Sequence, residues 1–253
     1  MDEFFASLLA PTMWGPFTKQ DGDRPQEMAY AAARAAGVAA PLAVALDRYN
    51  FYAFANAGTR EVFLEEQSWG GSDRELIERV DGSRPFRPFL DVDAPPGELG
   101  PEVVETIRAA AEGVARAWGV PADLAGFDLA TNHRTDKSSA HIVASGWLVP
   151  DGPAGRRFAE EVAAAGAPFI DIGASQCSRG ATLGLRLPMC RKLAKPLNPP
   201  TEVRGRCAKH IPGSWLEPRG DAPCRMADWC LQGETPPTGL YTDRRVSLSN
   251  QTH

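Results

Sequence analysis

Arg84-Pro-Phe-Arg-Pro-Phe-Leu-Asp-Val-Asp93 joins a strand-like apolar run to an Asp-x-Asp pair. Successive side chains of a strand point to opposite faces, so Asp91 and Asp93 share one face while Leu90 and Val92 point into a core. Two adjacent carboxylates repel each other unless a cation lies between them, and oxygen ligands suit Mg²⁺ or Mn²⁺. The pattern therefore predicts a scaffold strand that carries a divalent-metal site. The alternative is that the Asp-x-Asp pair forms a turn or a cap at the strand end.

Helical and strand patterns alternate on both sides of this stretch. The helix over 101–118 has the clearest signals, with Pro101 in its first turn, apolar residues at helical spacing and Gly119 beyond its end. Further helices are predicted over 26–36, 59–66 and 155–165, and strands over 41–55 (a strand or a hairpin), 88–92, 140–149, 168–172 and 183–187. Strands that alternate with helices predict an α/β or α+β domain with a sheet as its scaffold.

Composition places the chain among ordinary globular proteins. Of its 253 residues, 43% are hydrophobic and 23% charged, which excludes collagen-like, coiled-coil and largely disordered chains. Residues 1–178 carry 15 Lys and Arg against 26 Asp and Glu, a net charge of −11, whereas residues 179–253 carry 12 against 6, a net charge of +6. This asymmetry favours an acidic part that holds cations and a basic part that holds phosphates; a solvated basic tail is the alternative. We expect a leader over 1–24, a core over 25–195 and a Cys-, Arg- and Trp-rich appendage over 196–253.

Targeting and membrane signals are weak. No apolar stretch reaches the roughly 18 to 20 residues of a membrane span, and the acidic start Met1-Asp2-Glu3 lacks the basic region of a secretory signal. We therefore expect a soluble intracellular protein with no membrane partner. These patterns do not separate nucleus, organelle and viral replication site.

Two later segments add polar side chains to the expected sheet. Strand spacing puts Lys137, Ser139 and His141 on one face, as a row of an ammonium, a hydroxyl and an imidazole that fits a polyphosphate. A hydrogen-bonded structural histidine is the alternative. Asp171 lies among apolar residues in Pro168-Phe-Ile-Asp-Ile-Gly173, where a buried carboxylate needs a cation or hydrogen-bond donors; a cap is the alternative.

The stretch from Thr182 to Lys192 alternates cleanly between apolar and polar residues. Gly184 and Arg186 share one face, and the glycine is expected to leave room for a ligand beside the arginine. Arginine offers two hydrogen bonds to a phosphate and Lys192 a point charge. The stretch therefore favours an anion-binding strand.

The order of these segments resembles that of the archaeo-eukaryotic primase superfamily. The shared order is Asp-x-Asp, then Lys-x-Ser-x-His, then an apolar-flanked Asp, then Leu-Arg-Leu-Pro with a following Lys. Residues 84–93 and 137–143 are similar in particular to the primase-polymerase (PrimPol) branch and its relatives in herpesviruses and other large DNA viruses. The similarity covers residues 84 to 195. It implies a small N-terminal α/β module, an RRM-like sheet and a catalytic cleft between them.

The resemblance also implies a role for each site residue. The metal-binding carboxylates would be Asp91, Asp93 and Asp171. The residues that meet the phosphates and sugar of the incoming nucleotide would be Lys137, Ser139, His141, Arg186 and Lys192. The loop before Arg186 contains Ser178-Arg179-Gly180 and is longer than the equivalent loop of that branch, which leaves Arg186 rather than Arg179 as the candidate.

The appendage carries a possible zinc site. Four of the five cysteines follow residue 189, a poor match to a disulfide framework. Cys207, His210, Cys224 and Cys230 have the order Cys, His, Cys, Cys, and tetrahedral zinc accepts three cysteines and one histidine. The order is similar to the zinc element of the same branch, although the intervals are tighter. Unpaired thiols and a surface histidine are the alternative.

The expected function is a DNA-templated primase or polymerase. It would transfer nucleotides from NTP or dNTP to a 3′-hydroxyl on single-stranded DNA, with a replicative helicase or polymerase as a further partner. Such chemistry uses two divalent ions about 3.5 to 4 Å apart. The alternatives are a catalytically lapsed primase-like module that only binds nucleic acid, and a metal-dependent phosphohydrolase that uses the same Asp and His residues.

Overall fold

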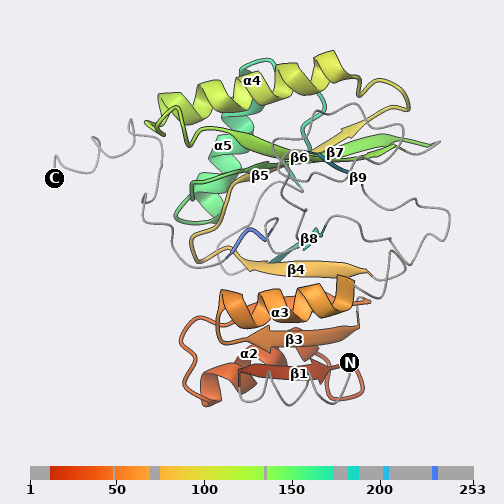
Figure 1. Cartoon of the computed structure of the whole chain (residues 1–253), viewed down its shortest axis with the longest axis vertical. Coiled ribbons are helices and arrows are strands. Elements are labelled where there is room, and N and C mark those ends of the chain that lie inside the picture. Colours follow the sequence, from red (N-terminus) through yellow and green to blue (C-terminus); the bar gives the residue numbers. More distant parts are fainter. Residues whose placement is uncertain are drawn as a thin grey trace, which may run out of the picture. The chain divides into compact units, whose positions relative to one another are not determined.

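The computed structural model describes residues 12–47, 49–68, 75–133, 136–173, 182–187, 202–204 and 230–232. The chain divides into two compact units (Figure 1). The first unit consists of Met1–Val80, Gly184–Thr201 and Cys224–Glu234, and the second of Asp81–Leu183, Glu202–Pro223 and Thr235–His253. Each unit combines helices with antiparallel strand pairs. The protein is therefore a mixed structure of the α+β kind, as its sequence predicts at that level.

Within the described ranges, the first unit contains a sheet of five strands in the order β1-β3-β2-β4-β8. The strands are β1 (Met13–Phe17), β2 (Leu42–Leu46), β3 (Asn50–Phe54), β4 (Leu76–Asp81) and β8 (Thr182–Arg186). The segment over 41–55, predicted as a strand or a hairpin, is a hairpin in which β2 and β3 pair Leu42 with Phe54 and Leu46 with Asn50.

Helices α2 (Pro25–Ala35) and α3 (Ala57–Ser68) belong to the same unit. Proline suits the first turn of α2 because the N–H it lacks has no partner there, and Gly37 follows the helix with a φ of +91°, which glycine adopts readily. The buried residues of α2 are Pro25, Ala29, Tyr30 and Ala33, of which Ala29 and Ala33 share a core cluster with Phe51 of the sheet. Small side chains let the helix lie close to the strands.

The second unit contains, in its described part, a sheet of four strands in the order β5-β7-β6-β9, and each neighbouring pair is antiparallel. The strands are β5 (Phe89–Ala94), β6 (Phe127–His133), β7 (Ser138–Ala144) and β9 (Glu202–Arg204). Helices α4 (Pro101–Ala117) and α5 (Gly152–Ala164) lie on one side of this sheet (Figure 1). We call the opposite side of the sheet its outer face.

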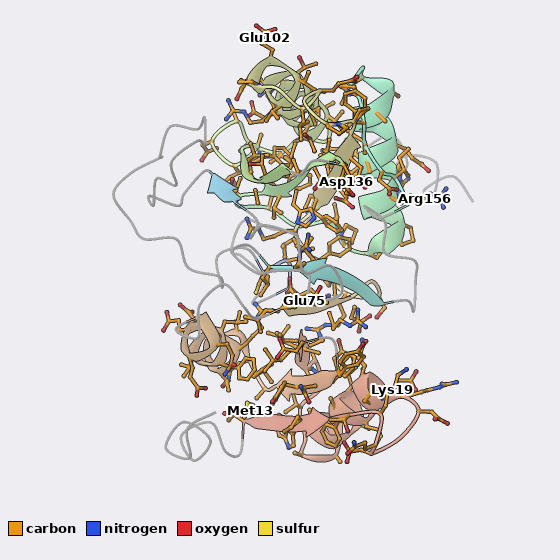
Figure 2. All side chains as sticks on the ribbon, turned by 90° about the vertical axis from the view of Figure 1, so that its right-hand side faces the viewer. Met13, Lys19, Glu75, Glu102, Asp136 and Arg156 are labelled. Atoms are coloured by element: carbon orange, nitrogen blue, oxygen red, sulfur yellow. The ribbon has the colours of Figure 1, made fainter. Side chains whose placement is uncertain are left out.

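An aromatic core joins the helices of the second unit to its sheet. The rings of Phe127 and Phe158 stack with 5.9 Å between their centroids, and Trp147 meets Phe158 edge-on at 5.3 Å. Figure 2 shows Glu102 and Arg156 pointing away from this core. Offset and edge-on pairs are the favoured geometries of aromatic rings, so these contacts stabilise the packing of the helices against the sheet.

Several predicted elements have the expected type and shifted ends. The helices predicted over 26–36, 59–66, 101–118 and 155–165 are α2, α3, α4 and α5. The start of α3 lies earlier than expected because Asn56, rather than Thr59, caps it: Asn56 Oδ1 accepts the N–H of Thr59 at 2.9 Å.

Other elements differ from the sequence predictions. Residues 13–17, assigned to a leader, form β1 of the first sheet. The strand predicted over 168–172 is reduced to one antiparallel bridge between Ile170 and Val92. Of the expected appendage, residues 202–204 form β9 and residues 230–232 are buried in the first unit. None of the described helices is long and apolar enough to cross a lipid bilayer.

Candidate metal centre

Strand β5 presents two carboxylates on the outer face of the second sheet. Leu90 and Val92 are fully buried, whereas the side chains of Asp91 and Asp93 are 22% and 37% exposed. This alternation follows from the two-residue period of a strand. Asp91 and Asp93 therefore lie on one face, as the sequence pattern indicates.

Asp171 reaches the same place from a turn after α5. Its backbone N–H donates to the carbonyl of Asp91 at 2.8 Å, and the N–H of Asp93 donates to the carbonyl of Phe169 at 3.0 Å. Phe169 has a φ of +63°, which interrupts the extended backbone. Asp171 is exposed rather than buried among apolar side chains, so the expectation of a buried carboxylate was wrong. The physical reason is that the segment makes a single bridge and then turns away from the sheet.

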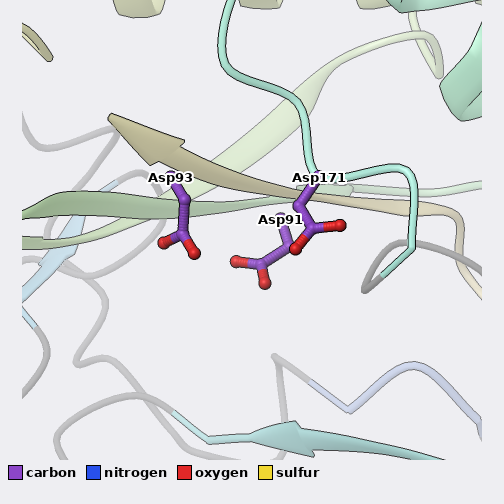
Figure 3. Close-up of side chains that lie close together, drawn as sticks. All are labelled: Asp91, Asp93 and Asp171. Atoms are coloured by element: carbon purple, nitrogen blue, oxygen red, sulfur yellow. The ribbon is translucent and has the colours of Figure 1, made fainter. Parts of the chain in front are cut away.

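The three carboxylates form one cluster (Figure 3). Each of Asp91, Asp93 and Asp171 offers one oxygen within 4.8 Å of the oxygens of the others. Mg²⁺ takes oxygen ligands at about 2.0 to 2.1 Å, so two oxygens on one ion are at most about 4.2 Å apart. A small side-chain rotation closes that difference. The donor set, made only of carboxylates, therefore fits a hard divalent cation such as Mg²⁺ or Mn²⁺.

Strand β7 sets a row of polar side chains beside these carboxylates. The register pairs Asp91 with His141 and Asp93 with Ser139. His141 Nε2 lies 3.4 Å from Asp91 Oδ1, and Lys137, just before the strand, donates from Nζ to Asp93 Oδ1 at 2.5 Å. The structure thus places Lys137, Ser139 and His141, the three predicted residues in or next to β7, beside the cluster. Their roles toward a nucleotide remain predictions.

The outer face also carries an ion pair that the sequence pattern did not predict. Arg87 Nη2 lies 3.3 Å from Asp128 Oδ2, and Arg87 Nε donates to the carbonyl of Ala144 at 2.5 Å. Both side chains are largely buried, with 15% and 7% exposure. Arg87 lies just before β5, so its two contacts link the start of β5 to Asp128 in β6 and to Ala144 in β7. The alternation in Phe127–His133 was a signal for strand β6 itself, but not for the pairing of its Asp128 with the distant Arg87.

Arg186 belongs to the first unit, in strand β8, where it is half-buried. The space next to Gly184, which we expected to admit a ligand, is filled by Arg79: a Cβ added at Gly184 would lie 2.6 Å from Arg79 Nη1. The Arg79 guanidinium lies 5.5 Å from the centre of the Phe51 ring, and burial lowers the pKa of Arg79. Gly184 therefore accommodates a neighbouring side chain.

The remaining predicted ligands are only partly described. Lys192, Cys207, His210 and Cys224 lie outside the described residues. Cys230 is buried, at 5% exposure, in the first unit. The zinc site therefore stays a prediction.

No protein-family model matches this sequence, and comparison with curated proteins gave no match.

Proposed function

We propose that this protein is a template-directed nucleotidyltransferase that makes or extends primers from NTP or dNTP with Mg²⁺ or Mn²⁺. The observation that carries the proposal is the cluster of Asp91, Asp93 and Asp171, which comes from two segments 78 residues apart in the chain and lies beside Ser139 and His141. This combination of carboxylates with hydroxyl and imidazole groups is what the resemblance to primase-polymerases implies.

The topology of the second unit supports the same proposal. Along the chain, β5, α4, β6, β7, α5 and the Ile170 bridge follow one another. In space, the Ile170 segment flanks β5, which flanks β7, which flanks β6. This is the βαββαβ arrangement, with the last strand shortened to a bridge. It agrees with an RRM-like sheet, in which the face away from the helices receives the nucleic acid.

We assign two kinds of role to the side chains of this face: some would bind the metal ions, and others would contact the nucleotide. The carboxylates of Asp91, Asp93 and Asp171 would hold the divalent ions, which when bound supply activation of the attacking oxygen and neutralisation of the leaving pyrophosphate. Ser139 and His141 would donate hydrogen bonds to phosphate or sugar oxygens, because both project from β7 next to the carboxylates. Lys137 would add a positive charge for a phosphate oxygen.

The test compares matched aspartate variants of the full chain. Asp91→Asn and Asp171→Asn remove one ligand charge each, while Asp123→Asn makes the same change at an exposed turn residue that is not part of the cluster. Incorporation of labelled dNTP or NTP on primed single-stranded DNA, with Mg²⁺ or Mn²⁺, should fall at least about 100-fold in the first two variants, because a metal supplies several kcal/mol of charge stabilisation and each 1.36 kcal/mol is a factor of ten. Asp123→Asn should keep the wild-type rate.

The products separate the proposal from its alternatives. Pyrophosphate release that depends on a template supports it. Release of inorganic phosphate without a template favours a phosphohydrolase, and binding of single-stranded DNA without incorporation favours a lapsed module. Unchanged synthesis by Asp91→Asn or Asp171→Asn would refute the assignment of the site.

A further inference from the structure

Lys137 makes the shortest charged contact of the candidate metal centre. Its Nζ lies 2.5 Å from Asp93 Oδ1, and both side chains are 37% exposed. The lysine stands just before β7, and the backbone register places Ser139, not Lys137, opposite Asp93. The Lys137 side chain therefore extends past its own position in the register to contact Asp93, a carboxylate that we assign to the metal ions.

A divalent ion and the lysine compete for this carboxylate. An ion about 2.1 Å from Asp93 Oδ1 would lie at most about 4.6 Å from an ammonium held 2.5 Å from the same oxygen. The divalent ion and the ammonium, with a total charge of +3, would then both contact one oxygen, and like charges so close repel each other. Binding of the ion at Asp93 therefore favours release of Lys137.

A released Lys137 has a second acceptor within reach if the site works as proposed. Its ammonium carries three donors and no acceptor, so it needs an anionic partner wherever it points. The neighbouring Ser139 and His141 face the same side of the sheet, where the phosphates of a nucleotide would lie. The lysine can thus exchange Asp93 for a phosphate oxygen by rotating its own side chain.

We propose that Lys137 is an exchangeable counter-ion that couples the metal site to the nucleotide. This inference rests on the proposed function. On Asp93 the lysine weakens the binding of divalent cation, and on a phosphate it strengthens the binding of nucleotide. Coupling between two ligands is reciprocal, so bound nucleotide also raises the affinity for the metal ion, because Lys137 then contacts a phosphate in place of Asp93.

The experiment measures Mn²⁺ affinity, with free Mn²⁺ followed by electron paramagnetic resonance, for the full chain after chelator treatment. Lys137→Met keeps the apolar stem and removes the charge. Lys19→Met makes the same change at an exposed lysine of the first unit, seen at the edge of Figure 2, and serves as the control. The Asp171→Asn protein, which keeps Asp91 and Asp93, shows how much of the Mn²⁺ binding depends on the complete cluster.

Without nucleotide, Lys137→Met should bind Mn²⁺ about 5-fold or more tightly than wild type, and Lys19→Met should not differ. A non-hydrolysable nucleoside triphosphate should then tighten Mn²⁺ binding more in wild type than in Lys137→Met. Equal or weaker Mn²⁺ affinity in Lys137→Met, with wild-type binding that depends on Asp171, would overturn the inference and leave the proposed function standing. Wild-type protein that binds no more Mn²⁺ than Asp171→Asn would overturn both.

Discussion

Two ion pairs of this protein each join a basic side chain to a carboxylate, but one is buried and the other is exposed to solvent. In the first unit, Arg60 Nη1 lies 2.9 Å from Glu78 Oε1, and the two side chains are 5% and 1% exposed. In the second unit, Lys137 and Asp93 make a contact of 2.5 Å with more than a third of each side chain exposed. Burial of an ion pair raises the cost of separating it, whereas water stabilises the separated ions of an exposed pair.

The buried pair has further partners that fix it. Glu78 accepts the backbone N–H of Leu231 at 2.6 Å and of Gln232 at 3.0 Å, about 150 residues further along the chain. These charge-assisted bonds use most of the acceptor capacity of the carboxylate. Glu78 therefore ties a C-terminal segment into the first unit. The contrast teaches that one kind of pair holds structure, while the other can exchange its partner for a ligand.

The largest expected effect comes from breaking the buried pair. Arg60→Met removes the cation that lies 2.9 Å from the buried carboxylate of Glu78, which should lower the free energy of unfolding by about 3–5 kcal/mol. Urea unfolding followed by circular dichroism measures it. Lys137→Met, the matched change at the exposed pair, should lower it by less than about 1 kcal/mol. Similar losses in both variants would contradict the contrast.

Two helix glycines of the second unit extend the comparison, because one lies in crowded and the other in open surroundings. A Cβ at Gly155 in α5 would lie 2.7 Å from Phe86 Cζ, whereas one at Gly113 in α4 meets nothing within 4 Å. Gly155→Ala should destabilise by about 1–3 kcal/mol, because a fully buried ring must move. Gly113→Ala should stabilise by about 0.5–1 kcal/mol through helix propensity. Thermal unfolding of both variants checks the signs; stabilisation by Gly155→Ala would show that the ring yields.

Local patterns were sufficient to predict the helices, whereas for residues 41–55 they left a strand and a hairpin as alternatives. Apolar spacing, a proline at the start and a glycine after the end determine α2 and α4 within a few residues. Strands β4 and β6 were missed because each carries charges that look unfit for a core. Glu78 and Asp128 are buried through Arg60 and Arg87, and neither arginine is near its partner in sequence. A single sequence does not reveal such distant compensation.

The candidate site was predictable in part for the same reason. The two-residue period of a strand places Asp91 with Asp93, and Ser139 with His141. It does not set the register between β5 and β7, which brings these pairs together. The turn at Phe169 that exposes Asp171, and the reach of Lys137 to Asp93, depend on contacts between strands and not on local pattern.

The most direct test of the account is Mn²⁺ binding by the full chain and by its aspartate variants at equilibrium. Asp171 is the decisive position, since it joins the cluster from a separate segment of the chain. We predict that wild type and Asp123→Asn bind Mn²⁺ alike and that Asp171→Asn loses at least about 10-fold in affinity, the cost of one missing ligand charge. Equal Mn²⁺ affinity in wild type and Asp171→Asn would contradict the claim that the three carboxylates form one metal centre.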